Sequence, residues 1–327
     1  MDLEEVQARR LQRARERRIR ARRRRAALAG LLVVIVLVVV AVALASGGGG
    51  GSPAHRRLAS AGARGHHRHH HGTAFHPGST VTGKPTGHPG STPVPILMYH
   101  VINPPPAGAP FPGLYVQPGE FASQMQALKA AGWHAVTLDQ VRAYWTKGVP
   151  LGPGRPFVLT FDNGYESQYT NALPVLRRLH WVADENIQLT GLPPSQGGLT
   201  KQQVEGLIDA GWELDTQGIS HADLVALSPS ELTEQVVNAR KKLQREYRVP
   251  VNWFCYPSGH YNAAVIAEVK AAGFVGSTTV IPGWASPSSD PFRLPRLRVL
   301  GGTSPSELLS EIASIRNDPA PPASYGT

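Results

Sequence analysis

Short apolar runs alternate with amphipathic stretches from residue 95 to about residue 317, and this alternation predicts one α/β domain. The runs that indicate strands are VPILMYHVI, HAVTLDQV, PFVLTFD, NWFCYPSG, FVGSTTV and FRLPRLRV. The stretches with helical spacing are PGEFASQMQALKAAGW, NALPVLRRL, KQQVEGLIDAGW, SPSELTEQVVNARKKLQREY and NAAVIAEVKAAGF. Strands that alternate with helices favour a parallel sheet, and about 220 residues suffice for one core.

Polar residues follow the apolar runs where strands are expected to end. The first run ends in Tyr99-His100, and the run from Phe157 ends in Asp162-Asn163 before Gly164. In parallel barrels the chemistry gathers at the C-terminal ends of the strands. We therefore expect His100, Asp162 and the residues after Tyr256 to lie close together.

The N-terminal pattern differs from the rest and predicts a membrane anchor. Residues 26–45 are twenty uncharged, apolar or small residues, and a helix of that length is about 30 Å long. Residues 1–25 contain eleven arginines and four acidic residues. The positive-inside rule then leaves this Arg-rich tail in the cytoplasm and the following chain outside a cell membrane, which it crosses once. A cleaved signal peptide is the alternative, although its apolar core is usually shorter.

Net charge and low-complexity segments add little to this picture. The formal charge of +10 is concentrated before the predicted membrane helix, so it does not point to nucleic acid as a partner. Residues 46–94 form a Gly/His/Pro-rich linker without periodicity, and residues 318–327 are expected to be a flexible tail. The histidines at 66–71 could bind zinc or copper, associate with a cell wall, or only space the domain. Cys255 is the single cysteine, and its apolar surroundings favour a buried, unreactive thiol.

Five segments in order resemble the polysaccharide deacetylase family, that is, the NodB-homology domains of carbohydrate esterase family 4. They are VPILMYHVI, FVLTFDNGY, GWELDTQGISHADL, FCYPSGHYN and FRLPRLRV, and they cover about residues 95–317. The resemblance implies an irregular (β/α)7 barrel. It also implies removal of acetyl groups from chitin-like sugars, peptidoglycan or xylan, with a glycan as the partner.

The resemblance assigns a catalytic base and a metal site, and this sequence departs from the family at the metal. Asp162 matches the base of the family motif T-F-D-D-G, whereas Asn163 replaces its second Asp, a metal ligand. In the second motif, H-[ST]-x-x-H, His221 matches the second His and Gln217 replaces the first. The family metal is usually zinc, which polarises the acetyl carbonyl and activates water. One imidazole and two amides form a poor zinc site.

The resemblance also implies residues that line a substrate groove. Tyr165 matches the aromatic residue after the first motif, and His100 is a further substrate-binding candidate. The third motif supplies the remaining wall residues, which are Tyr256, Pro257, Gly259 and Tyr261. The late catalytic His of the family, a general acid, has no match, and His260 is the available substitute.

A second departure lies after the first helix of the domain, where the family has an apolar strand. The sequence reads Asp184-Glu185-Asn186 there, and buried unpaired acids are costly. These residues are expected to face the barrel mouth, to pair with cations, or to mark a strand that does not form normally. Asp184, Glu185, Asp215 and His260 are candidate replacement ligands for a relocated metal.

Three functional interpretations follow for a membrane-anchored, extracytoplasmic member of the family. The first is a zinc-dependent deacetylase that hydrolyses carbon–nitrogen non-peptide bonds of N-acetylated glycans. The second is a catalytically impaired pseudoenzyme that keeps the fold and binds glycan, and the third is altered chemistry with a relocated metal. A basic structural or DNA-binding role is disfavoured by the place of the charge.

Overall fold

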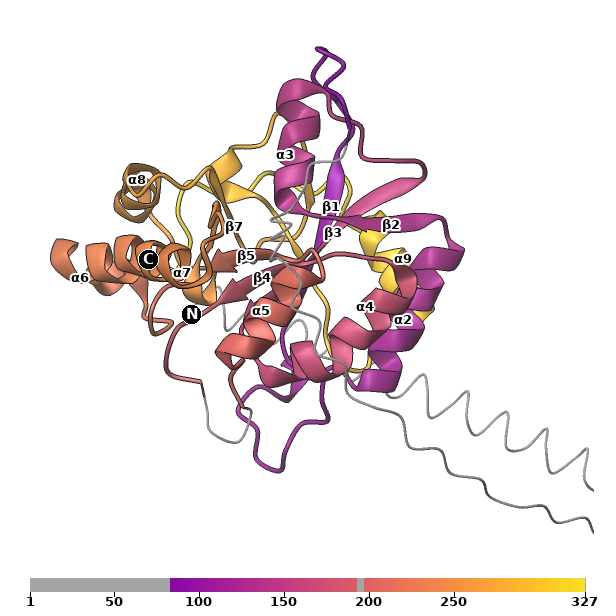
Figure 1. The fold of residues 1–327 in the computed structure, drawn as a ribbon, viewed down its shortest axis with the longest axis horizontal. Helices are drawn as coiled ribbons and strands as arrows, with labels where there is room; N and C mark the ends of the chain where they lie inside the picture. The colour runs from indigo at the N-terminus through magenta and orange to yellow at the C-terminus, as the bar shows by residue number, and fades with distance from the viewer. Residues whose placement is uncertain (1–82, 193–196, 327) are drawn as a thin grey trace, which may run out of the picture. The chain divides into compact units, whose positions relative to one another are not determined.

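The computed structural model describes residues 83–192 and 197–326, which form an α/β domain around a nine-stranded sheet (Figure 1). The predicted cytoplasmic tail, the predicted membrane helix and most of the predicted linker lie outside these residues. None of the helices within the described ranges has both the length and the apolar character that a bilayer crossing requires. Membrane anchoring therefore stays a prediction from the sequence.

The sheet confirms the predicted α/β class with parallel strands. Its strands are β1 (Val94–Tyr99), β2 (Trp133–Val136), β3 (Arg155–Asn163), β4 (Asp184–Ile187), β5 (Glu213–Thr216), β6 (Trp253–Cys255), β7 (Gly276–Thr278), β8 (Trp284–Ala285) and β9 (Leu297–Arg298). The strand order is β7-β6-β5-β4-β3-β1-β8, with β2 beside β3 and β9 beside β1. Only β8 runs antiparallel to its neighbour. Because β7 and β8 stand at opposite ends of this order, the sheet is an open half-barrel rather than a closed one.

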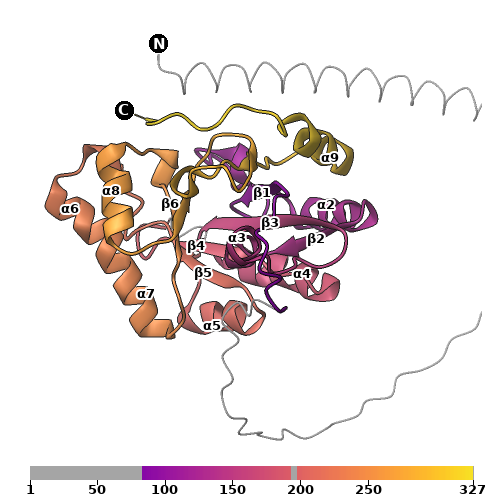
Figure 2. The same ribbon diagram turned by 90° about the horizontal axis from the view of Figure 1, so that it is seen from above.

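Helices flank the half-barrel in two groups. They are α2 (Pro118–Ala130), α3 (Leu138–Lys147), α4 (Leu173–Leu179), α5 (Lys201–Asp209), α6 (Pro229–Thr233), α7 (Ala239–Tyr247), α8 (Ala263–Ala271) and α9 (Pro305–Ser314). Figures 1 and 2 show α2, α4 and α9 together beside one end of the sheet and α6, α7 and α8 beside the other. The long helix expected from Pro229 to Tyr247 forms as α6 and α7, which are joined by a π-helical turn.

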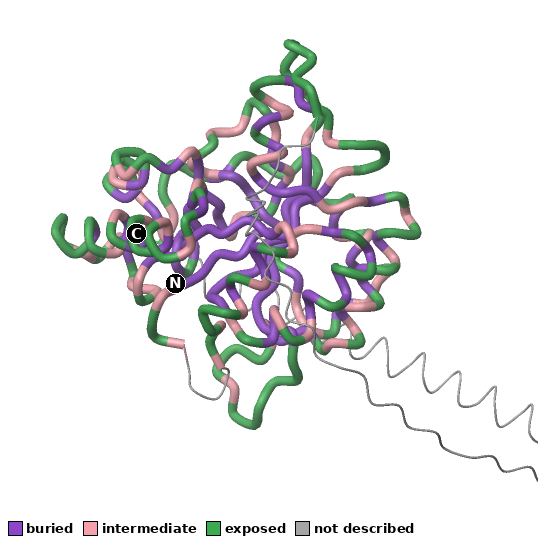
Figure 3. Tube along the Cα trace, in the orientation of Figure 1, coloured by how far each residue is buried: buried purple, intermediate pink, exposed green. Residues whose placement is uncertain are grey.

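Successive side chains of a strand point to opposite faces of the sheet. One face packs into an apolar core, and the other faces the polar interior of the half-barrel. On one face of β3, Phe157, Leu159 and Phe161 belong to a buried apolar cluster, and Phe161 stacks on Trp212 at a ring-centroid distance of 5.0 Å. Figure 3 shows the buried residues following the strands, with exposed residues on the outer helices and loops. On the other face, Asp162 points into the half-barrel. The fold therefore positions one carboxylate inside while its neighbours form the core.

The segment HAVTLDQV, predicted as one strand, is divided between β2 and α3. The strand ends at Val136 because Thr137 caps a helix: its hydroxyl accepts from the Gln140 N–H, and the Gln140 side chain accepts from the Thr137 N–H. This reciprocal capping box starts α3 where the apolar alternation alone suggested more strand. As a result, the N–H groups of Leu138 and Asp139 point into the half-barrel.

The C-terminal residues that were expected to form a flexible tail contact the domain instead. Tyr325 and Tyr261 exchange two backbone hydrogen bonds of 2.9 Å. The Tyr261 hydroxyl also donates to the Pro322 carbonyl at 2.8 Å. These bonds hold the tail against the segment that follows β6.

The parallel strands bring several polar residues to one edge of the half-barrel. We define the mouth as the C-terminal ends of β1, β3, β4, β5 and β6. The residues at these ends are His100, Asn163, Gln188, Gln217 and Tyr256. As expected from the sequence, residues far apart in the chain meet at this edge.

Candidate active site

Asp162, at the end of β3, is held by a buried arginine. Arg296 binds both carboxylate oxygens of Asp162, with Nη1–Oδ1 and Nη2–Oδ2 distances of 2.8 and 2.9 Å. Each of the two residues is 1% exposed. The other guanidinium hydrogens reach the Thr160 hydroxyl, the Thr279 carbonyl and the Cys255 sulfur. All five donors of Arg296 are therefore used, and this bidentate geometry fixes the position of the carboxylate.

The ion pair keeps Asp162 charged. Burial alone would raise the pKa of Asp162, but the charge and hydrogen bonds of Arg296 outweigh burial and lower the pKa to about 2. Burial raises the pKa of the Cys255 thiol to about 12, which agrees with the prediction of an unreactive cysteine. Asp162 is thus an anion at neutral pH, as a base must be.

Two amide side chains complete the surroundings of Asp162. Asn186, on the adjacent strand β4, donates to Asp162 Oδ1 at 2.9 Å. Gln168 donates to the backbone carbonyls of Asp162 and His100 at 2.8 and 2.9 Å, which ties the ends of β3 and β1 together. Sequence comparison with the family motifs did not identify Arg296, Asn186 or Gln168. Arg296 and Asn186 reach Asp162 from 134 and 24 residues away in the chain, and Gln168 links Asp162 to His100, which lies 68 residues from Gln168.

The Asn163 side chain forms a hydrogen bond with a neighbouring side chain. Its Nδ2 donates to Gln188 Oε1 at 2.6 Å, and Gln188 in turn donates to the Thr190 carbonyl. The backbone of Asn163 has a φ of 81°, in the left-handed region that Asn tolerates better than most residues. An amide is the appropriate group here because a carboxylate could not donate to Gln188.

The residues at the three metal positions do not fit a zinc ion. Gln217 is 3% exposed, and its Oε1 has no hydrogen-bond partner. Burial lowers the pKa of His221, so its imidazole is neutral and able to act as a ligand. In the described ranges, His221 does not join two other His, Cys, Asp or Glu ligand atoms in a common cluster. One imidazole with two neutral amides lacks the anionic or additional imidazole ligand that catalytic zinc sites have.

The two remaining histidines differ in their access to Asp162. His100 Nε2 lies 4.0 Å from Asp162 Oδ2, and His100 Nδ1 is buried without a partner. Burial lowers the pKa of His100 to about 4 against the opposing effect of Asp162. His260 Nδ1 instead lies 3.0 Å from Asp223 Oδ1, and the ring packs against Tyr325. His100 is therefore the one of the two that approaches Asp162, whereas His260, which the sequence suggested as the acid, is paired with Asp223.

The wall residues implied by the third motif are more buried than a groove lining requires. Tyr256 and Tyr261 are 1% and 0% exposed. The Tyr256 hydroxyl donates to the Phe292 carbonyl, as that of Tyr261 does to the tail. Pro257 and Gly259 are buried in the same turn. The two tyrosine hydroxyls are therefore engaged by backbone carbonyls, and the substrate-binding role of the four residues stays a prediction from the sequence.

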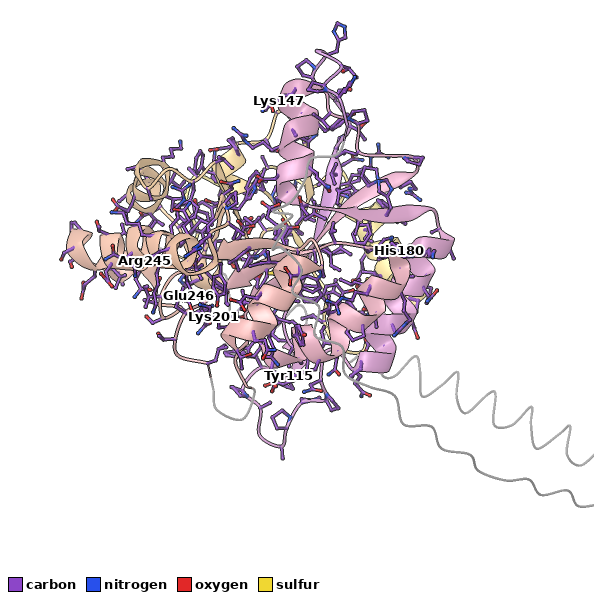
Figure 4. The ribbon with its side chains drawn as sticks, viewed as in Figure 1. Tyr115, Lys147, His180, Lys201, Arg245 and Glu246 are labelled. Carbon is purple, nitrogen blue, oxygen red and sulfur yellow. The ribbon has the colours of Figure 1, made fainter. Side chains whose placement is uncertain are left out.

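Tyr165 remains at the mouth. It is half-buried, and burial together with the charges of Tyr115 and Asp162 raises its pKa to about 12. A hollow of about 370 Å³ lies nearby, beside Gly164 and the segment that follows β4. Lys201 and Glu246, labelled in Figure 4, line its other side, and Asp162 is not among its lining residues.

The polar strand that departs from the family forms normally as β4. Asp184 and Asn186 face the interior, where Asn186 contacts Asp162 and Asp184 accepts from the Leu138 N–H at 2.9 Å. Glu185 is 1% exposed, and both of its carboxylate oxygens lack a side-chain partner. Of the candidate replacement ligands, the structure brings Asp184 and Asp215 together, and it separates Glu185 and His260 from them.

Comparisons with known proteins agree with the motifs and the half-barrel. Residues 152–277 match the family model described as polysaccharide deacetylase. YxkH of Bacillus subtilis, which carries the same family description, is 28% identical over 225 residues, covering 68% of this chain and 77% of YxkH. The poly-beta-1,6-N-acetyl-D-glucosamine N-deacetylase of Staphylococcus epidermidis is 27% identical, covering 55% of this chain and 66% of that protein. The structure of the Streptococcus pyogenes deacetylase PplD in complex with acetate superimposes with a TM-score of 0.62 at 27% identity, covering 68% of this chain and 99% of PplD.

Proposed function

We propose that this chain, whose residues 152–277 match the polysaccharide deacetylase family model, binds an N-acetylated polysaccharide at its mouth. We propose further that it does so without the zinc-dependent deacetylation that is usual in that family. The observation that carries this proposal is the donor set of Asn163, Gln217 and His221. The Asn163 amide is engaged by Gln188, and the Gln217 oxygen is a neutral acceptor. Without zinc there is neither a polarised acetyl carbonyl nor an activated water, so Asp162 alone has little to act on.

The proposed ligand is a glycan that contains N-acetylglucosamine. Support comes from the related Staphylococcus epidermidis protein, whose name specifies poly-beta-1,6-N-acetyl-D-glucosamine. Peptidoglycan and chitin-like chains contain the same N-acetylated sugar and are the alternatives. The domain is proposed to act outside the cell membrane, anchored by residues 26–45, because eleven arginines precede that apolar segment.

Deacetylation is the second candidate function, and one observation favours it. Asp162 is ionised, oriented by Arg296 and only 4.0 Å from His100, which is an arrangement suited to proton transfer. Decay of a catalytic site does not require this base to persist. Retained hydrolysis of the carbon–nitrogen bond of an acetamido group would explain why it does.

Metal content and acetate release of the full-length chain test the proposal. The wild type and Asn163→Asp/Gln217→His are compared in detergent, with the histidines at 66–71 changed to Ser in both so that they bind no zinc. The wild type is expected to bind poly-β-1,6-N-acetylglucosamine oligomers with less than about 0.1 zinc per chain. The double variant is expected to gain about one zinc per chain, because it adds one carboxylate ligand at position 163 and one imidazole ligand at position 217.

Asp162→Asn is the matched control for acetate release, since it removes the base and leaves the metal positions unchanged. Wild-type acetate release equal to that of Asp162→Asn supports a binding function. Stoichiometric zinc in the wild type, with acetate release well above Asp162→Asn, would establish the second candidate instead. Failure of both proteins to bind any N-acetylated oligomer would refute the glycan ligand.

A further inference from the structure

Three buried carboxylates meet inside the half-barrel below the mouth. We call Asp184, Glu213 and Asp215 the carboxylate triad; they are 0%, 5% and 0% exposed. Asp184 on β4 is paired in register with Glu213 on β5, and Asp215 follows two residues later on the same face. One ligand oxygen from each residue lies within 4.8 Å of the others. The triad lies toward the starts of these strands and does not include Asn163, Gln217 or His221.

Each carboxylate of the triad is anchored through one of its oxygens by the backbone. The Leu138 N–H donates to Asp184 Oδ1 at 2.9 Å, and the Asp139 N–H donates to Glu213 Oε2 at 3.1 Å. Both donors belong to the first turn of α3. In the same way, two backbone N–H groups at the start of β6 donate to Asp215 Oδ1, at 2.8 and 3.2 Å. These bonds orient the carboxylates and favour their charged forms.

The second oxygen of each carboxylate has no partner outside the triad. Asp184 Oδ2, Glu213 Oε1 and Asp215 Oδ2 are buried without a donor from another part of the described chain, and the Asp184 and Glu213 carboxyls lie within hydrogen-bond reach of each other. In the described part of the chain, no Lys, Arg or His side chain forms an ion pair with the triad. Three adjacent buried carboxylates without a cation are strongly unfavourable. The negative charge of the triad must therefore be neutralised by protons that the carboxylates share or by a metal ion.

A hollow lies against the Glu213 side of the triad. Its volume is about 130 Å³, and Glu213 and Asp139 are its acidic lining residues, with Trp212 and Pro250 beside them. The Asp139 carboxylate is already engaged by Asn252 and Trp253, which leaves Glu213 as the acid available to an entering ion. Within the triad, Glu213 lines this hollow and Asp184 and Asp215 do not, so the hollow reaches one edge of the triad.

From this geometry we infer that Asp184, Glu213 and Asp215 bind one hard divalent cation, with Ca²⁺ preferred. All the ligand atoms are carboxylate oxygens, which suit Ca²⁺, Mg²⁺ and Mn²⁺ and do not select zinc. Ca²⁺ accepts irregular sets of carboxylate oxygens, whereas Mg²⁺ requires a near-ideal octahedron and usually keeps several waters. Three buried carboxylates from two adjacent strands, with ligand atoms within 4.8 Å of one another, form such an irregular set and favour Ca²⁺.

The bound ion would join elements that position the base. The ion would link β4 and β5 directly, and it would link the start of α3 through the backbone bonds to Asp184 and Glu213. The backbone bond to Asp215 would connect the start of β6 as well. Asn186, two residues after Asp184, donates to Asp162. The cation is thus structural: it stabilises the strands beneath the mouth and takes no part in reaction at Asp162.

Chelation and re-addition of metal to the full-length chain, in detergent, test the inference. Calcium is expected to bind at one ion per chain and to raise the unfolding midpoint by about 5 °C or more at a hundredfold excess over Kd. Zinc is expected to give no comparable rise. Terbium(III), a luminescent substitute for calcium, is expected to emit on tryptophan excitation, because Trp253 donates to Asp215 and Trp212 lines the hollow.

Two variants localise the effect. Asp184→Asn/Asp215→Asn is expected to lose both the calcium shift and the terbium emission. The matched control is Glu185→Gln, a buried acid on the other face of β4, which should keep both responses. If the double variant fails to fold, Glu213→Gln replaces it. A wild type that neither binds calcium nor gains stability overturns the inference in favour of shared protons, and loss of the response in Glu185→Gln places the ion elsewhere.

Discussion

Asp162 and the carboxylate triad occupy the same polar interior, yet they are neutralised in different ways. Asp162 has a guanidinium on both oxygens and a pKa lowered to about 2. The triad has backbone N–H groups and, at Glu213, the Thr137 hydroxyl, but no guanidinium. Burial with neighbouring acids raises the pKa of Asp184 and Asp215 well above their usual values and that of Glu213 to about 8. Burial alone therefore does not decide the charge of an acid. The presence of a fixed cation does.

Removing the cation from Asp162 should make it resemble the triad. Arg296→Met leaves a buried carboxylate unpaired, so the free energy of unfolding is expected to fall by about 3–5 kcal/mol. Chemical denaturation measures this loss. Arg293→Met is the matched control, because Arg293 pairs with the partly exposed Asp290 and its ion pair should contribute about 1 kcal/mol or less. Similar losses in the two variants would contradict the special role of Arg296.

The pH dependence of stability tests the neutral histidine beside Asp162. The pKa of His100 falls from 6.5 to about 4 on folding, so below pH 6.5 the unfolded chain binds a proton that the folded chain does not. The free energy of unfolding is therefore not reduced by His100 above pH 6.5. As the pH falls from 6.5 toward 4, protonation of the unfolded chain lowers this free energy by up to about 3 kcal/mol. The measurement is the difference between the wild type and His100→Gln in denaturation curves from pH 7 to pH 4. A difference that does not change with pH would contradict a buried neutral imidazole.

Asp184→Asn in chelating buffer should have the smallest effect of the three changes. The Asn carbonyl can still accept from the Leu138 N–H, and the substitution removes one of three adjacent buried acids. We expect the free energy of unfolding to change by less than about 1 kcal/mol, because the lost interactions and the relieved repulsion oppose each other. Thermal and chemical denaturation in EDTA measure it. A loss as large as that of Arg296→Met would mean that Asp184 has a cation-like partner without any metal.

The sequence predicted the α/β class and the place of Asp162 at the end of a buried strand, because these depend on local periodicity and short motifs. It could not identify Arg296 as the partner of Asp162. The segment FRLPRLRV has three arginines, and only the folded geometry shows which of them enters the interior. The hydrogen bonds of Tyr256 and Tyr261 could not be predicted for a similar reason: a tyrosine in a motif does not reveal that its hydroxyl donates to a backbone carbonyl.

Two departures from the family could be seen in the sequence, but their meaning could not. Asn163 was recognised as a replaced ligand, yet its hydrogen bond to Gln188 depends on the register between β3 and β4. Asp184 and Asp215 are candidate replacement ligands in the sequence, but the sequence pattern does not reveal the capping box that starts α3. That capping box supplies the N–H groups that orient Asp184 and Glu213.

The contact between the chain end and the segment after β6 affects how the protein should be purified. Gly326 lies against the His260 ring, where an added Cβ would come within 2.2 Å of Cδ2. His260 is also close enough to His221 for its charge to affect that imidazole. A hexahistidine tag appended after residue 327 would therefore emerge beside the mouth and could donate the imidazole that Gln217 does not provide. Metal bound by such a fusion would be a property of the tag, so a removable handle is needed for any measurement of zinc.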